Sequence, residues 1–301
     1  LGEIRQATSA TSLPDMGLVF FAGGIGVSGY SQSIDIYNAS LNSWSLYKMT
    51  NGRQQLASAS LSKHNLAFFA GGCCDNNAMM FSIIDIYNGN SNKWTTAYLS
   101  ISRAQHASSS LDDIVMFAGG VTNSIMNFTI VDSVDIYNAL TNKWTTAKLS
   151  VARYYFAGTS LPNYGIIFFG GGQSNSGQSN AVDIYNLNTD QWTTASLSFP
   201  RNSLTATSLP NHGLIFFAGG GGFNSIDIGH VDIGHVDIYN ATSNKWSTAK
   251  LSNGRFNLAS TSLTEDGLAF FGGGQSSNVN NEALDTIDVY NVHTNSWYIT
   301  N

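Results

Sequence analysis

The sequence has few cysteines, and therefore few of the disulfides that could stabilise its fold in addition to core packing. Its only two cysteines, Cys73 and Cys74, are adjacent, which excludes disulfides between distant segments. Two free thiols are expected there, in preference to a bond between neighbours. No apolar run approaches the roughly 20 residues of a membrane-spanning helix, and the first residues do not resemble a signal peptide. Packing is therefore expected to stabilise the fold.

Charged residues are also scarce in the sequence. Charged residues make up 11% of the chain, against about 25% in a typical globular protein. Lysine and arginine total 13 and aspartate and glutamate 19, so the net charge is −6. This balance, without any basic run, argues against a nucleic-acid or anionic-membrane partner. Only three glutamates are present, so candidates for general acid–base catalysis are few. We expect a protein that is not an enzyme and has no cofactor.

The 301 residues contain one sequence unit that is repeated six times. Each copy has an arginine, a leucine eight residues later, and an apolar stretch that ends in Gly-Gly, such as "FFAGG" at 20–24. Asp-(Ile/Val)-Tyr-Asn follows, and then a tryptophan seven residues after the tyrosine. Successive tryptophans are 48 to 54 residues apart. The copies contain every tryptophan of the chain: Trp44, Trp94, Trp144, Trp192, Trp246 and Trp297.

A period near 50 residues, with Gly-Gly followed by spaced Tyr and Trp, resembles the kelch repeat. The resemblance covers the whole chain. It implies an all-β fold, a six-bladed β-propeller with four-stranded antiparallel blades around a central channel. It implies a single domain over 1–301, with blades at about 1–48, 49–98, 99–148, 149–196, 197–250 and 251–301. We expect a monomeric propeller, alone or within a larger multidomain chain.

The second copy shows how the residues themselves favour such a blade. "QLASASLS" (55–62) predicts strand A, "NLAFFAGG" (65–72) strand B, "SIIDIYN" (82–88) strand C and "KWTTAYL" (93–99) strand D. Turn signals such as "LPDMG" join A to B. Gly-Gly permits positive φ and close backbone approach where strand B ends. Tyr and Trp are expected to fill the wedges between blades.

The connections suggest where function lies. Because antiparallel strands alternate in direction, the A–B and C–D turns share one end of a blade, and the B–C and D–A connections share the other. The first set is nearly constant among the copies, whereas the B–C connections differ. Variable loops on a rigid scaffold are where binding residues concentrate. The leading hypothesis is a non-catalytic binding module that recognises a protein or peptide segment on the face of the B–C and D–A loops.

Two roles are open for the six arginines, which precede strand A on that face. The chain is similar here to the kelch-type substrate adaptors of ubiquitin ligases, whose acidic peptide ligands dock among such arginines, so the resemblance implies binding of an acidic ligand. Alternatively, Arg–Asp pairs or Arg–carbonyl bonds clamp adjacent blades to each other. The arginines are Arg5, Arg53, Arg103, Arg153, Arg201 and Arg255, and the strand-C aspartates are Asp35, Asp85, Asp135, Asp183, Asp237 and Asp288.

Aromatic side chains are the other binding candidates. Tyr154, Tyr155 and Phe156 follow Arg153 where the other copies are mostly polar or small, and Phe256 follows Arg255. The long loops add Tyr30, Met79, Met80, Phe81, Phe128 and Phe223. Together these residues would form an apolar patch of the kind that marks an interface, unless they fold back over the blade edges.

Other functions stay open. A carbohydrate-binding propeller is the first alternative, because the loops are rich in Asn, Gln and aromatic residues. A kelch-type enzyme, an oxidase or a sugar epimerase, is the second. No metal site is expected, since the weak candidates His230 and His235 lie in the duplication "DIGHVDIGHV" (227–236), whose five-residue period is not a known ligand spacing. The sequence does not distinguish a cytoplasmic from an extracellular location.

Overall fold

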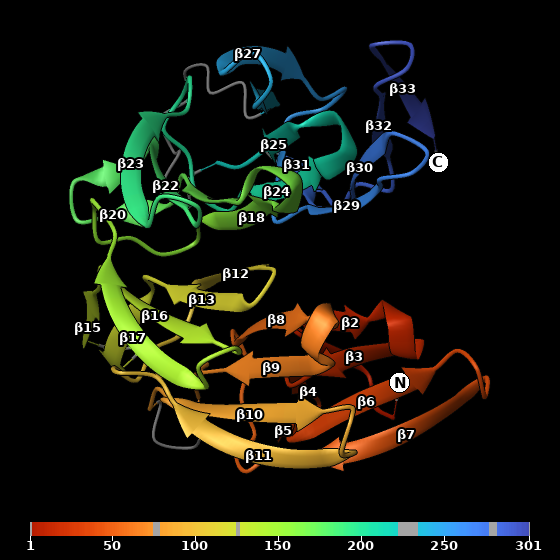
Figure 1. The fold of residues 1–301 in the computed structure, drawn as a ribbon, viewed down its shortest axis with the longest axis vertical. Coiled ribbons are helices and arrows are strands. Elements are labelled where there is room, and N and C mark those ends of the chain that lie inside the picture. The colour runs from red at the N-terminus through yellow and green to blue at the C-terminus, as the bar shows by residue number, and fades with distance from the viewer. Residues whose placement is uncertain (1, 75–78, 125–126, 222–233, 277–281, 301) are drawn as a thin grey trace. The chain divides into compact units, whose positions relative to one another are not determined.

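A computed structural model describes residues 2–74, 79–124, 127–221, 234–276 and 282–300 (Figure 1). It contains six four-stranded antiparallel sheets, each built from one contiguous stretch, which we number 1 to 6 in chain order. Within the described ranges, no helix is long and apolar enough to cross a bilayer. The prediction of an all-β chain with four strands per repeat is confirmed.

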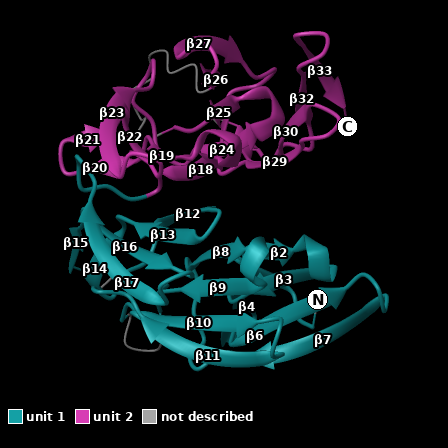
Figure 2. Cartoon of the chain, in the orientation of Figure 1, with its two compact units in different colours: residues 1–154 teal, residues 155–301 magenta. Residues whose placement is uncertain are grey.

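Sheets 1 to 3 belong to a compact unit, Leu1–Tyr154, which we call unit 1 (Figure 2). Sheet 1 consists of β2 (Ser9–Leu13), β3 (Leu18–Ala22), β6 (Ser33–Asn38) and β7 (Ser43–Lys48). Sheet 2 consists of β8 (Ala57–Leu61), β9 (Leu66–Ala70), β10 (Ile83–Asn88) and β11 (Lys93–Tyr98). Sheet 3 consists of β12 (Ala107–Leu111), β13 (Ile114–Ala118), β16 (Ser133–Asn138) and β17 (Lys143–Lys148).

Sheets 4 to 6 belong to a second compact unit, Tyr155–Asn301, which we call unit 2 (Figure 2). Sheet 4 consists of β18 (Ala157–Leu161), β19 (Ile166–Gly170), β22 (Ala181–Asn186) and β23 (Gln191–Ser196). Sheet 5 consists of β24 (Thr205–Leu209), β25 (Leu214–Ala218), β26 (His235–Asn240) and β27 (Lys245–Lys250). Sheet 6 consists of β29 (Ala259–Leu263), β30 (Leu268–Gly272), β32 (Ile287–Asn291) and β33 (Ser296–Thr300). A single domain over the whole chain stays a prediction.

The strands of each sheet follow the predicted order A–B–C–D. In sheet 2, β8 pairs with β9, β9 with β10 and β10 with β11, and Tyr87 lies opposite Trp94. Short hairpins occupy several B–C connections. They are β4 (Ile25–Gly26) with β5 (Gly29–Tyr30), β14 (Val121–Ser124) with β15 (Asn127–Ile130), and β20 (Gln173–Ser174) with β21 (Gly177–Gln178).

The A–B turn is a single turn of 3-10 helix in four repeats. In the first, Pro14 fixes the entry and Gly17 ends the turn at φ +64°, a left-handed conformation that costs glycine little. The four are η1 (Pro14–Met16), η2 (Ser62–His64), η3 (Pro162–Tyr164) and η4 (Pro210–His212). The neighbouring C–D turn is tied to this one, because the Ala39 backbone N–H donates to the Gly17 carbonyl at 2.8 Å.

The repeated tyrosine closes the C–D turn. The Tyr87 hydroxyl donates to the Asn92 side-chain oxygen at 3.0 Å, and Asn92 has a φ of +50°. Asparagine tolerates this left-handed conformation better than most residues. The same bond, at 2.9 to 3.0 Å, joins Tyr37 to Asn42, Tyr137 to Asn142, Tyr185 to Asp190, Tyr239 to Asn244 and Tyr290 to Asn295. In the fourth repeat, burial and then the bond to Asp190 raise the pKa of Tyr185 to about 12.

The core lies between successive sheets. Phe20 of sheet 1 packs against Phe69 and Tyr87 of sheet 2, with ring centroids 5.8 and 5.4 Å apart. Phe168 of sheet 4 contacts Tyr239 of sheet 5 in the same way, at 5.2 Å. Strand-B phenylalanines therefore fill the wedge against the tyrosine of the next sheet, which confirms the expected place of the tyrosines within each unit.

The Gly-Gly pair joins one repeat to the next. Gly72, the second glycine of its pair, has φ +101°, and its N–H donates to the carbonyl of Arg103 in the following repeat at 2.9 Å. A Cβ on Gly72 would lie 2.7 Å from the Gln54 carbonyl oxygen. Corresponding bonds of 2.8 to 2.9 Å run from Gly24 to Arg53, Gly120 to Arg153, Gly172 to Arg201 and Gly220 to Arg255. The pair is glycine because the backbones meet too closely for a side chain.

This close approach can be tested with two matched glycines. Gly72 and Gly29 share φ +101°, but a Cβ on Gly29 has nothing within 4 Å. Gly29→Ala should lower the free energy of unfolding by about 1–2 kcal/mol, the cost of the backbone conformation alone. Gly72→Ala should cost about 3 kcal/mol or more, because the collision adds to that cost. Urea unfolding measures both, and equal losses would contradict the packing role of the pair.

Candidate functional site

In five of the six repeats, the segment around the arginine lies beside the B–C connection of its own repeat. In repeat 1, β1 (Arg5–Gln6) pairs with β4. In repeat 2, Gln54 and Cys73 exchange backbone hydrogen bonds of 3.1 and 2.9 Å. The same pairing joins Ala104 to Val121, Asn202 to Gly221, and β28 (Arg255–Phe256) to β31 (Gln275–Ser276). These segments lie at the end of the sheets where the strand directions predict them, and we call this end of the sheets in either unit the loop face.

The arginines of this face point into the sheets. The Arg53 guanidinium donates to the Phe69 carbonyl at 3.0 Å and to the Asp85 carboxylate at 2.6 Å. Arg103 binds the Phe117 carbonyl and Asp135, and Arg201 the Phe217 carbonyl and Asp237. Arg5 and Arg255 likewise bind Asp35 and Asp288. For Arg53, Arg103 and Arg201 the contacts therefore link strands B and C of the arginine's own sheet.

Most of these arginines expose almost none of their surface to solvent. The exposed fraction is 0% for Arg53, Arg103, Arg153 and Arg255, and 1% for Arg201. Burial lowers the pKa of Arg53 below its ordinary value, while Asp85 opposes that shift. A buried charge of this kind is retained only with a partner. The expected Arg–Asp pairs and Arg–carbonyl bonds are thus present, but these side-chain contacts lie within one sheet and do not clamp adjacent blades. Ligand binding by the arginines stays a prediction.

The second residue after each arginine adopts a left-handed backbone. Gln55, Gln105 and Tyr155 have φ values of +54°, +56° and +53°, which are uncommon for residues other than glycine. The conformation recurs at Ala7, Ser203 and Asn257. It aligns backbone groups of successive repeats: the N–H of Gln105 donates to the Gln55 carbonyl at 3.1 Å, and that of Ser203 to the Tyr155 carbonyl at 2.8 Å. In unit 1 it also brings the Gln55 and Gln105 side chains to 3.0 Å from each other.

An apolar cluster lies on the loop face of unit 1. Its buried members are Cys73, Cys74, Met80, Ala104 and Val121, and Tyr30, Ile130 and Tyr154 pack against it half-buried. We call these eight residues the loop cluster. Of the predicted binding residues, the structure thus brings Tyr30 and Tyr154 together. Phe128 extends the cluster, because its ring lies edge-on to Tyr154 at 5.8 Å and is 46% exposed.

The loop cluster contains a disulfide that the sequence analysis did not favour. Cys73 and Cys74 are bonded to each other, so the expectation of two free thiols is wrong. Both cysteines are fully buried, and Cys74 has a φ of +82°. The Cys73 sulfur touches the Gln55 side-chain oxygen at 3.3 Å. The bond makes the start of this B–C connection a rigid apolar base for Met80 and its neighbours.

The other predicted residues are not members of this cluster. Phe81 and Phe256 are half-buried, and Tyr155 begins unit 2. Phe156 is buried edge-on to Phe169 at 6.1 Å. His235 opens β26 and stacks on Phe199 at 5.6 Å. Phe223 and His230 lie outside the described residues. Among the residues that the structure describes, no three His, Cys, Asp or Glu side chains gather as a metal site would require.

A buried histidine stands where four of the other five repeats have an apolar residue. His106 follows Arg103 by three positions, where Leu56, Leu204 and Leu258 occupy the matching sites. Within the described part of the chain, neither ring nitrogen of His106 has a hydrogen-bond partner. Burial, and then the charges of Arg103 and Arg53, hold its pKa well below the ordinary 6.5. The ring is therefore neutral in the folded protein at neutral pH.

His106 should make stability depend on pH. The unfolded chain takes up a proton near pH 6.5, whereas the folded chain does not, so the free energy of unfolding falls below that pH by up to about 1.4 kcal/mol per unit. His106→Leu should remove that part of the loss and add about 1–2 kcal/mol at pH 7 by replacing unpaired polar atoms. Thermal unfolding from pH 5 to 8 measures this, with His293→Leu at an exposed turn as control. The same slope in His106→Leu and in the unaltered protein would contradict this assignment.

The disulfide can be checked by alkylation of the unfolded protein. Without reductant, iodoacetamide should leave Cys73 and Cys74 unmodified, because neither sulfur is a thiol. After treatment with dithiothreitol, mass spectrometry should show two adducts, one for each cysteine of the chain. Two adducts without reductant would restore the free thiols that the sequence alone favours.

Comparison with known proteins supports the fold described above. No model of a protein family matches the chain, and no curated protein is significantly similar to it in sequence. The structure is similar to the solved structure of YjhT, a kelch-repeat propeller protein. The TM-score is 0.70 at 17% sequence identity, over 99% of this chain and 97% of that one. This likeness confirms an all-β fold of repeated four-stranded antiparallel sheets, consistent with a six-bladed β-propeller.

Proposed function

We propose that this chain is a kelch-type propeller that acts as a non-catalytic binding module, and that a protein or peptide segment docks on its loop face. The single observation that carries the proposal is the loop cluster with its exposed margin. Phe128 and Met79 are 46% and 49% exposed beside the buried disulfide and Tyr154. Exposed apolar side chains around a packed base are the usual anchors of an interface.

The backbone around the cluster supports a preformed surface. Cys73 pairs with Gln54 in the segment after Arg53, and the Phe81 N–H donates to the Gly72 carbonyl at 2.9 Å. The Arg103 N–H donates to the Phe81 carbonyl at 3.0 Å. A surface already held in its bound form loses little conformational freedom when a ligand docks.

The charges of the face favour an apolar rather than an acidic ligand. The arginines that would attract carboxylates are buried, and those of sheets 1, 2 and 3 already contact aspartates. The large exposed side chains at the margin of the cluster, Phe128 and Met79, are instead uncharged and apolar. We therefore propose a peptide segment that inserts a large apolar side chain beside Phe128.

Peptide selection with matched variants tests this proposal. A displayed peptide library is selected against the immobilised protein, and the affinity of enriched peptides is then measured by calorimetry. Phe128→Ser and Met79→Ser should each weaken binding by about tenfold, because each removes an apolar anchor. Leu140→Ser is the control, since Leu140 is 70% exposed at the C–D turn, the opposite end of sheet 3.

The outcomes separate clearly. Enriched peptides that share an apolar or aromatic residue, and that bind the Leu140→Ser variant normally, support the proposal. Recovery of no peptide, or an equal loss in all three variants, overturns it. Circular dichroism of each variant shows that the sheets are intact when affinity is compared.

A further inference from the structure

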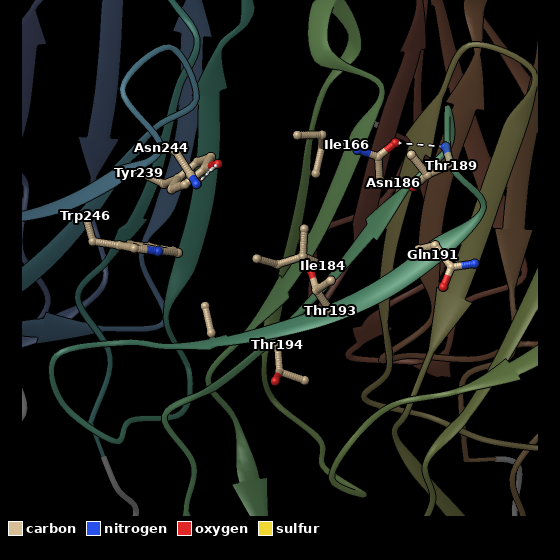
Figure 3. A pocket seen from close by; sticks show the side chains of 11 residues that line it. Ile166, Ile184, Asn186, Thr189, Gln191, Thr193, Thr194, Tyr239, Asn244 and Trp246 are labelled. Atoms are coloured by element: carbon tan, nitrogen blue, oxygen red, sulfur yellow. Dashed lines mark hydrogen bonds between the residues drawn. The ribbon is translucent and has the colours of Figure 1, made fainter.

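A groove lies between sheets 4 and 5 of unit 2 (Figure 3). Its volume is about 340 Å³, within the range of about 300–1,000 Å³ that small-molecule sites occupy. One wall is sheet 4, with Ile184, Asn186 and Thr193. The other is sheet 5, with Tyr239 and Trp246. The indole of Trp246 faces the strand that carries Thr193 (Figure 3).

The interface between sheets 1 and 2 shows what can occupy the space in front of the indole. Tyr47 of β7 stacks face to face on Trp94 of β11, with centroids 3.8 Å apart and an interplanar angle of 5°. Tyr47 stands three residues after Trp44, and the matching residue of sheet 4, three after Trp192, is Ala195. Ala195 lies on the wall that faces Trp246. The protein thus supplies a six-membered ring to the indole in one interface and omits it in the other.

The residues that line the groove indicate what kind of ligand ring would fit in front of Trp246. Of the described residues that line the groove, none is charged. Amide and hydroxyl groups line the groove, among them Asn186, Gln191, Thr193 and Asn244. A charged ligand would meet no counter-charge here. An aromatic side chain would suit the indole but leave most of these polar groups to water. A neutral sugar ring offers C–H groups for the indole face and hydroxyls for the amides.

Two of the amides are already fixed in place. The Asn186 side-chain oxygen accepts the backbone N–H groups of Asn188 and Thr189 at 2.9 and 3.2 Å. The Asn244 oxygen accepts the Tyr239 hydroxyl at 2.9 Å. Because the oxygens are held by the protein, the amide nitrogens are positioned as donors for a ligand hydroxyl. Fixed donors raise affinity by reducing the ordering cost of binding.

We infer that the groove between sheets 4 and 5 is a binding site for a neutral carbohydrate, with one sugar ring stacked on Trp246 in the place that Tyr47 takes on Trp94. Asn244 then binds a hydroxyl of that ring, and Asn186, on the wall formed by sheet 4, is available to a further sugar unit of a longer oligosaccharide. The site is independent of the peptide surface proposed for unit 1.

The structure suggests the variant that tests this inference. Ala195→Tyr should place a ring on Trp246 as Tyr47 does on Trp94, filling the groove without loss of packing. Ser196→Tyr is the matched control, because residue 196 points to the opposite face of the same strand. The protein is labelled with 5-fluorotryptophan, so each of its six indoles gives a separate fluorine signal. Trp246→Phe identifies the signal of Trp246, and Trp94→Phe that of Trp94.

Maltohexaose, cellohexaose and mannohexaose are then titrated, with N-acetyltyrosinamide as an aromatic comparison. The Trp246 signal should move saturably with at least one hexaose, whereas the Trp94 signal, covered by Tyr47, should not. Ala195→Tyr should weaken the apparent affinity by about tenfold or more, and Ser196→Tyr should leave it unchanged. No saturable shift, equal shifts at Trp94, or a response to N-acetyltyrosinamide alone would overturn the proposal.

Discussion

Buried arginines make the contacts on which the rest of the structure depends. The side chain of Arg103, for example, binds two strands of its own sheet through the Phe117 carbonyl and Asp135. The carbonyl of Arg103 accepts the N–H of Gly72 from the preceding repeat. One residue therefore fixes strands B and C and also the spacing to the next sheet. Such a charge is stable in the interior only while its partners stay in place, so the repeat keeps arginine, aspartate and glycine together.

This arrangement affects the surface as well as the core. In a chain with only 11% charged residues, placing its arginines inside leaves aromatic, amide and hydroxyl groups to provide recognition. Both proposed sites have that character. The loop cluster offers Phe128 and Met79 beside a buried disulfide, and the groove offers Trp246 with asparagine side chains. Recognition by these groups depends on shape and hydrogen bonding, and it should be little affected by salt.

Strands and turns could be predicted because six copies repeat the same signals. Gly-Gly marks the end of strand B in each of them, and proline and asparagine mark the turns. The roles of the arginines could not be decided, since one Arg and one Asp per repeat fit both an internal pair and a ligand site. The bond between Cys73 and Cys74 was missed because neighbouring cysteines rarely meet the geometry of a disulfide.

The candidate sites were harder to predict than the fold. Tyr30, Tyr154 and Phe128 were expected on the loop face, and the structure places them together there. His106 and Ala195 gave no signal of their own. A histidine in a strand-rich sequence does not reveal its burial, and an alanine matters only when the indole opposite it is known. Both are recognised by comparing matching positions among the repeats after the sheets are aligned.

The stacking of Tyr47 on Trp94 implies that the number of ligand-binding sites in this fold is determined separately at each interface between sheets. A tyrosine at that position closes the space in front of the neighbouring indole, and an alanine leaves it open, with the strands unchanged. Ala97, Ala147 and Ala249 stand at the same position in three other repeats. Exchanging single residues there would alter how many rings the chain can hold at once, and hence its avidity for a polymer, without altering the affinity of any one site.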